Sequence, residues 1–278
     1  MNLQPWSIWP DMEAIYRFFS RLGQPTIRML VHLNRLNRLS LETLHWIFVA
    51  PFRGKKIRWR SVIEQGVRVG WDSIPIVAVI SFFVGLILAM QAAYQLKPFG
   101  ATIYVANLVA VSLTRELGPI LTAIIIAGRF GSSIAAEIGT MKVAEEIDAL
   151  RTMGLNPINF LVVPRFLALL IMLPALTLIA DFLGILGAYL FSISALDIAS
   201  IRFINQTSNA LVMRDLITGL IKTGVFAVII ASIGCYEGFI VEGGAEGVGR
   251  STTNSVVASI FMIITADVVF TALFYSTL

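Results

Sequence analysis

Five long apolar runs dominate the part of the chain that follows residue 71. Each supplies about 20 residues or more, which is enough for a helix to cross the hydrocarbon core of a bilayer. The alternation with short polar stretches predicts five membrane-spanning helices. In order, the runs are Ile74–Ala93, Ile103–Ala127, Phe166–Leu196, Leu216–Tyr236 and Thr253–Tyr275.

Local signals within these runs predict how the helices pack and bend. In the first run, Ser81, Gly85, Ala89 and Ala93 recur every four residues and form a stripe for close helix packing. In the second, Pro119 removes the helical donor for the carbonyl of Arg115 and predicts a kink. The third run is long, but it lacks an internal turn signal, so we interpret it as one bent or tilted span.

The polar stretch between the second and third runs has a helical period. Val143, Ile147, Leu150 and Met153 fall on one face, and the opposite face is polar. This pattern predicts an amphipathic helix over Val143–Met153, outside the membrane. A helix between two spans is well placed to dock a soluble partner, and we expect Ile147 and Leu150 to be buried in that partner.

A second amphipathic pattern lies before the first span. Over Pro25–Val49, leucine, isoleucine and other apolar residues share one face, while arginine and histidine occupy the other. An apolar face opposite a basic one is typical of a helix that lies in the membrane surface. The glycine-poor region 197–215 and the region 237–251 show no such pattern, and we expect them to be connecting loops.

Charged residues inside the apolar runs are the candidate functional residues. Arg115, Glu116 and Asp181 lie near the middle of their spans, and Asp267 lies somewhat past the middle of its own. Because charges in lipid are costly, these side chains should face the bundle interior or a wet cavity. The alternative is an ion pair, such as Arg115 with Asp181, that only fixes helix register. Lys222 is closer to an end of its run, and we expect it to reach outward to the surface.

The composition agrees with a polytopic membrane protein. Apolar residues make up 57% of the 278 residues and charged residues only 14%, whereas soluble domains average about 25% charged residues. Residues 1–71 hold 11 Lys/Arg against 4 Asp/Glu, which places the N-terminus in the cytoplasm by the positive-inside rule. We therefore divide the chain into an interfacial region, 1–71, and a permease region, 72–278. A nucleic-acid partner is not expected, because the first span follows the basic segment directly.

Motifs for catalysis are weak. The segment that begins at Gly244 matches a phosphate-binding loop except for Arg250 in the lysine position. Such a loop needs a strand before it and a helix after it in an α/β domain, and this chain has no such domain. We find no spaced His/Cys cluster and no nucleophile motif, so neither an enzyme site nor a cofactor site is expected in this chain.

The sequence of residues 115–165 closely resembles that of the MlaE family of ABC-transporter permeases. It reads RELGPILTAIIIAGRFGSSIAAEIGTMKVAEEIDALRTMGLNPINFLVVPR. The similarity continues through DFLGILGAYL, DLITGLIKTGVFAVIIASIGCYEG and GVGRSTTNSVVASI. It covers roughly residues 40–278. The family includes bacterial lipid-transport permeases and a chloroplast lipid-import permease.

The resemblance implies a homodimeric permease in a bacterial inner membrane that moves phospholipids. Its partners would be two separate ATPase subunits, which bind the ATP, and MCE-domain lipid-binding proteins outside. Arg115 and Glu116 match the charged pair near the family's lipid cavity, where Asp181 and Asp267 are further candidates. The family's cytoplasmic coupling helix would comprise Glu137, Val143, Glu145, Glu146, Ile147, Asp148, Leu150 and Arg151.

Two other functions fit the pattern without the resemblance. An ion-coupled secondary transporter or channel could use Glu116, Asp181 and Asp267 as its ion path. A membrane scaffold without transport activity would need no path at all. With five spans and a cytoplasmic N-terminus, the C-terminus is expected outside in each case.

Overall fold

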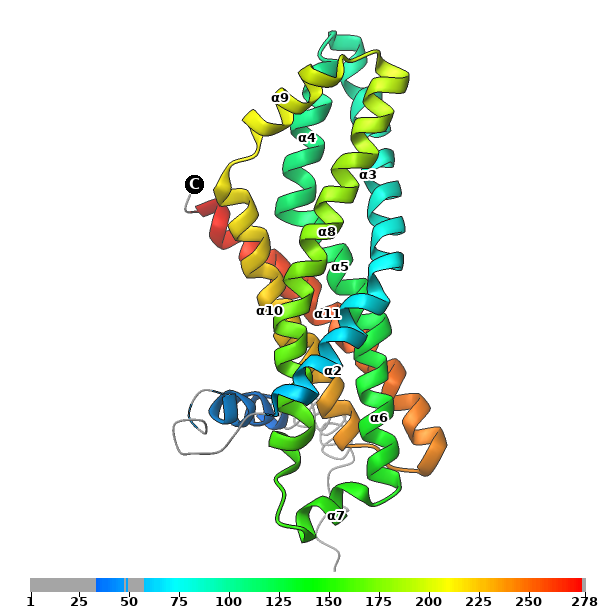
Figure 1. Cartoon of the computed structure of the whole chain (residues 1–278), viewed down its shortest axis with the longest axis vertical. Helices are drawn as coiled ribbons and strands as arrows, with labels where there is room; N and C mark the ends of the chain where they lie inside the picture. Colours follow the sequence, from blue (N-terminus) through cyan, green and yellow to red (C-terminus); the bar gives the residue numbers. More distant parts are fainter. Residues whose placement is uncertain (1–33, 48, 50–57, 277–278) are drawn as a thin grey trace, which may run out of the picture.

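The computed structural model describes residues 34–47, 49 and 58–276, and the regular structure in this part of the chain is helical. Five helical segments are long and apolar enough to cross a membrane, which confirms the predicted number of spans. Most of them run along the long axis of the molecule, and the last two cross it at a slant (Figure 1). In order they are Trp59–Phe99, Thr102–Val143, Ile158–Leu196, Met213–Phe239 and Gly244–Phe274.

The first segment extends well beyond the predicted run at its N-terminal end. Helix α2 (Trp59–Gly70) leads through one turn of 3-10 helix, η2 (Trp71–Ser73), directly into α3 (Ile74–Leu96). Because the backbone is already helical at Ser73, its side chain makes no cap for α3. It accepts a hydrogen bond of 2.7 Å from Nη1 of Arg129 instead. Short 3-10 turns, η3 (Lys97–Phe99) and η4 (Thr102–Tyr104), form the connection that follows.

The second segment is interrupted where Pro119 predicted a kink. Helix α4 (Val105–Ser112) passes into a π-helical turn, η5 (Leu113–Leu117), before α5 (Gly118–Ile126). A π turn widens the helix by one residue, and it places Arg115 and Glu116 on the widened turn. A second π turn, η6 (Ala127–Gly131), leads into α6 (Ser132–Val143).

The predicted helix over Val143–Met153 is wrong in its extent. Val143 is the last residue of α6, and the chain then turns at Glu145, whose φ of 57° is left-handed. The new helix, α7, spans only Glu146–Thr152. A left-handed residue ends a helix because it redirects the backbone, and the 3.6-residue pattern across the turn gave no sign of this.

The third segment is one continuous helix, as predicted. After the π turn η7 (Ile158–Val162), α8 runs over Val163–Leu196 and keeps Pro174 in its interior. The region 197–215 is not only a loop, because it contains α9 (Ser200–Ala210). Phe203 is the buried residue of α9 and packs edge-on against Tyr189 of α8, with ring centroids 5.5 Å apart.

The last two segments are α10 (Met213–Phe239) and α11 (Gly244–Ser276). The glycine-rich segment that resembles a phosphate loop forms the first turns of α11, so the expected loop over 237–251 is much shorter. Thr252 donates its hydroxyl to the carbonyl of Gly249 within this helix rather than capping its start. The segment is neither preceded by a strand nor folded as a loop.

A helix over residues 34–47 lies beside the lower part of the bundle, above α7, and runs across the direction of the steep spans (Figure 1). Leu39, Leu44 and Ile47 pack against the main hydrophobic core. Ser40 donates a hydrogen bond of 3.0 Å to Ser232 of α10. Residues 25–33 of the predicted interfacial helix, and the region before them, lie outside the described residues.

The predicted small-residue stripe of α3 is buried at its contact with α8. Ser81, Gly85, Ala89 and Ala93 are all buried. A Cβ atom at Gly85 would collide with the backbone of Gly184 in α8. The two helices can approach this closely only because neither carries a side chain at the crossing.

Replacing Gly85 with alanine should therefore destabilise the protein. The added Cβ meets backbone atoms, which cannot rotate away, so we expect a loss of about 1–3 kcal/mol. The control is Gly224→Ala, since a Cβ atom at Gly224 would meet nothing within 4 Å. Thermal unfolding in detergent measures both variants. Equal melting temperatures for the two variants would show that the α3–α8 crossing tolerates separation.

Candidate functional site

The π turn η5 presents two charged side chains toward α10 and α11. Arg115 and Glu116 are neighbours in sequence, so their side chains diverge and find different partners. Arg115 lies 3.6 Å from Asp215 at the start of α10, measured from Nε to Oδ1. Glu116 pairs with Lys222, two turns further along α10. The structure therefore separates the adjacent charges into two ion pairs.

Lys222 is the centre of the larger group. Its exposed fraction is 1%, and its ammonium lies between the carboxylates of Glu116 and Asp267, with Oδ1 of Asp267 at 2.9 Å. It also donates a hydrogen bond of 2.8 Å to the hydroxyl of Thr271. Thr271 in turn lies 3.2 Å from each carboxylate oxygen of Glu116, to which it donates. We call Glu116, Lys222, Asp267 and Thr271 the charge cluster.

The prediction that Lys222 reaches outward to the membrane surface is wrong. Lys222 does not reach outward to the surface, because two acids from neighbouring helices, Glu116 and Asp267, hold its ammonium inside the bundle. The sequence did contain an indication that Lys222 is buried. The apolar runs hold three acidic candidates but only one arginine, so their negative charges outnumber the positive ones. A buried set of this kind needs a second cation, and Lys222 supplies it. Asp215 and Thr271 carried no comparable signal.

Asp181 does not join the charge cluster and does not pair with Arg115. It is buried in the middle of α8, and its Oδ1 atom finds no hydrogen-bond partner among the described residues. The carboxylate lies against Gly118, where a Cβ atom would overlap with it. The ion pair suggested for Arg115 and Asp181 is therefore replaced by Arg115 with Asp215.

The charge cluster combines two carboxylates with one ammonium. The carboxylates outnumber the ammonium, and Glu116 keeps about a third of its side chain exposed, although Lys222 is buried. Such a group can attract the cationic part of a ligand to Glu116, while the Arg115 guanidinium nearby can contact a phosphate. Among the described residues, no group of three or more His, Cys, Asp or Glu side chains could hold a metal ion.

The residues predicted to form the coupling helix to an ATPase subunit lie at the polar end of the molecule, in α6, in α7 and in the turn between them. Glu137 of α6 does not lie on α7; its carboxylate joins Arg165 of α8 at 2.7 Å and Arg68 of α2 at 3.2 Å. Asp148 of α7 pairs with Arg151 at 3.0 Å. The outer surface of this end is formed by exposed side chains, among them Val143, Glu145, Glu146, Asp148 and Arg151.

The apolar face of α7 points inward, contrary to expectation. Ile147 and Leu150 have exposed fractions of 1% and 8% and belong to the main hydrophobic core. A partner cannot bury side chains that the chain itself already buries. The large exposed apolar residues at this tip are Val143, Met153 and Leu155, of which Met153 is 65% exposed.

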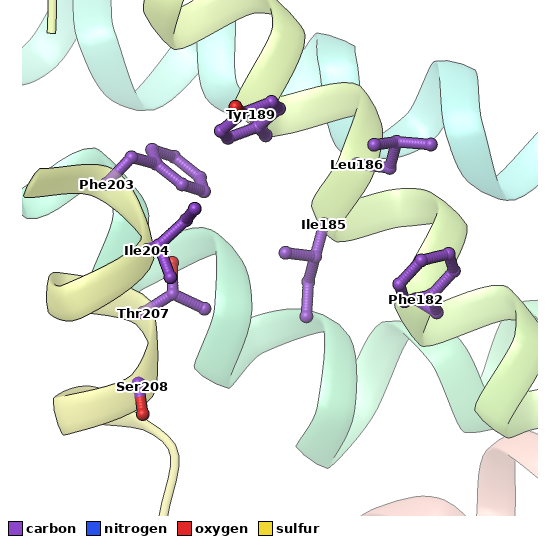
Figure 2. Close-up of a pocket in the computed structure, with 8 residues that line it drawn as sticks. All are labelled: Phe182, Ile185, Leu186, Tyr189, Phe203, Ile204, Thr207 and Ser208. Atoms are coloured by element: carbon purple, nitrogen blue, oxygen red, sulfur yellow. The ribbon is translucent and has the colours of Figure 1, made fainter. Parts of the chain in front are cut away.

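An apolar groove of about 380 Å³ lies at the opposite end, between α8 and α9. Figure 2 shows four side chains from each helix lining it, and none of them is charged. No residue of the charge cluster lines this groove, so it adds no charge chemistry to that site. The lining residues are Phe182, Ile185, Leu186, Tyr189, Phe203, Ile204, Thr207 and Ser208.

Comparisons with known proteins agree with this architecture. The family Permease MlaE matches residues 62–273. A probable ABC transporter permease protein of Rickettsia conorii (strain ATCC VR-613 / Malish 7) is 44% identical over 261 residues, which cover 94% of this chain and 99% of that protein. A probable ABC transporter permease protein of Rickettsia bellii (strain RML369-C) is 40% identical over 254 residues, with coverages of 91% and 96%.

A plant relative extends the comparison. The chloroplastic protein Trigalactosyldiacylglycerol 1 of Arabidopsis thaliana is 37% identical over 220 residues, which cover 79% of this chain and 63% of that protein. The family match includes the charge cluster, α7 and all five membrane segments, except for the outermost residues of the first and last segments. The chain is therefore a multi-pass membrane protein that belongs to the MlaE permease family.

Proposed function

We propose that this permease moves phospholipids between membranes, and that ATP hydrolysed on a separate subunit drives it. The observation that carries the proposal is the charge cluster. A buried ammonium between two carboxylates is costly inside a membrane, and such groups mark substrate paths. Glu116 and Arg115 are consecutive residues on the widened π turn, and together they offer both signs of charge to a zwitterionic or anionic headgroup.

The relatives support the same substrate class. One of them is named after a galactolipid, and the others are named as probable ABC transporter permeases. The polar tip around α7 is the proposed contact for the ATPase subunit. A homodimer, two such ATPase subunits and an MCE-domain lipid-binding protein complete the proposed assembly. In a bacterial inner membrane, the tip and the N-terminus would face the cytoplasm and the C-terminus the other side.

The excess carboxylate supports a second candidate, transport driven by an ion gradient. Glu116, Lys222 and Asp267 could exchange a proton or a cation with the solvent through the exposed part of Glu116. This mechanism needs no ATPase. It therefore differs from the first candidate in its energy source, which can be measured directly.

Reconstitution distinguishes the two candidates. The chain and its ATPase partner are placed in proteoliposomes, and transfer of a fluorescent phospholipid to an acceptor is followed over time. We expect transfer that requires ATP and stops with vanadate. Transfer that follows an imposed proton or sodium gradient without ATP would instead support the ion-coupled mechanism. Liposomes with the ATPase alone provide the baseline.

A further inference from the structure

A polar cavity lies at the end of the bundle that carries α7, away from the charge cluster. Its volume is about 400 Å³, within the range of ligand clefts. Four parts of the chain enclose it: the helix over residues 34–47, the α6–α7 region, the segment around Pro157, and the last turn of α10. None of the residues of the charge cluster lines it.

Three cations from distant parts of the sequence converge on this cavity. Arg35, Lys142 and Arg151 line it together with a single carboxylate, Glu42. Asp148 holds two of the cations next to each other, since it lies 3.7 Å from Lys142 and 3.0 Å from Arg151. Three positive charges face Glu42 and the shared Asp148, so the wall keeps one positive charge in excess.

The rest of the wall suits an amphiphile. Leu39, Ile147 and Phe239 supply an apolar side. Asn156 uses its carbonyl oxygen to accept the backbone N–H of Ile158 at 2.8 Å, so its amide N–H₂ group is the part that can serve a ligand as donor. Cations, an amide donor and an apolar wall therefore meet in one cavity, and the helix over residues 34–47 forms one side of it.

We propose that this cavity binds the phosphate headgroup of an anionic phospholipid from the adjacent leaflet. Arginine and lysine bind phosphate oxygens strongly, and basic pockets beside membrane helices bind anionic headgroups. A free phosphate ion would use only the cationic wall, whereas a phospholipid also covers the apolar one. Bound lipid would join the helix over residues 34–47 to α7. Any effect of this link on ATP-driven transport rests on the proposed function, but the binding does not.

Melting temperatures of the purified chain in a neutral detergent test the binding. Short-chain phosphatidylglycerol is titrated, with short-chain phosphatidylcholine and inorganic phosphate in parallel. We expect phosphatidylglycerol to raise the melting temperature of the unmodified chain, and the other two to raise it far less. Removing one cation, as in Arg35→Gln or Arg151→Gln, should raise the half-maximal concentration about fivefold. Arg35→Lys keeps the charge and should restore most of the affinity.

The control variants remove arginines that do not line the cavity. Arg38 is exposed on the same helix as Arg35, and Arg60 pairs with Glu64 on α2. Arg38→Gln and Arg60→Gln should leave the titration unchanged. The proposal is overturned if phosphatidylcholine or inorganic phosphate matches phosphatidylglycerol in the unmodified chain. It is equally overturned if the control variants lose as much affinity as Arg35→Gln and Arg151→Gln.

Discussion

Replacing Lys222 with methionine is expected to produce the largest loss of stability of any single change in the charge cluster. Methionine fills a similar volume but leaves the carboxylates of Glu116 and Asp267 facing each other without a cation. Breaking a buried pair by removing one partner costs about 3–5 kcal/mol. We expect a lower melting temperature in detergent and no lipid transfer in proteoliposomes.

A compensated variant separates stability from transport. Lys222→Met combined with Glu116→Gln and Asp267→Asn removes all three charges, so no uncompensated charge stays buried. Replacing a complete buried set by neutral residues is often neutral or stabilising. If the cluster binds substrate, this triple variant should regain its melting temperature but not its lipid transfer. Recovery of both properties would show that the cluster only fixes the register of the helices.

A charge at the tip beside α7 is expected to detach the ATPase subunit while the permease stays folded. Met153 is 65% exposed, and its burial by a partner would be worth about 1.5–3 kcal/mol. Met153→Asp should therefore weaken ATPase association about tenfold or more in a pull-down from detergent. The melting temperature of the permease alone should not change, because Met153 has little contact with its own chain.

Two further variants make this experiment specific. Thr152→Asp places the same charge on the neighbouring exposed residue and should have a smaller effect, since threonine offers less apolar surface. Ile147→Asp puts a charge into the core, and we expect it to lower the melting temperature first and association only as a consequence. If Met153→Asp leaves both association and lipid-stimulated ATP hydrolysis intact, the ATPase does not bind this tip.

The fold could be predicted largely from the sequence because membrane segments obey a simple physical rule. Water is absent from the bilayer core, so a segment that crosses it must be apolar, helical and long enough. This rule located all five spans, and Pro119 located the interruption of the second one. It did not reveal α2 or α9, because short amphipathic helices next to a membrane have no comparable length requirement.

The candidate site could be predicted only in part. Arg115, Glu116 and Asp267 stood out because a charge inside an apolar run is conspicuous on its own. Asp215 and Thr271 did not, and the position of Lys222 was predicted wrongly, since pairing depends on how α10 and α11 rotate against η5. That rotation placed Lys222 between two acids and Asp215 beside Arg115, and it left Asp181 apart.

The sequence by itself determined the number of spans and the amphipathic character of the 146–152 segment, because each of these depends on neighbours within one helix. Only the tertiary structure decided which charges meet and which face of α7 is covered. Ile147 and Leu150 show the reason: an apolar face must be buried, but the pattern does not specify whether the chain or a partner buries it. In this protein the chain does so, and the surface available to a partner is Met153 and its exposed neighbours.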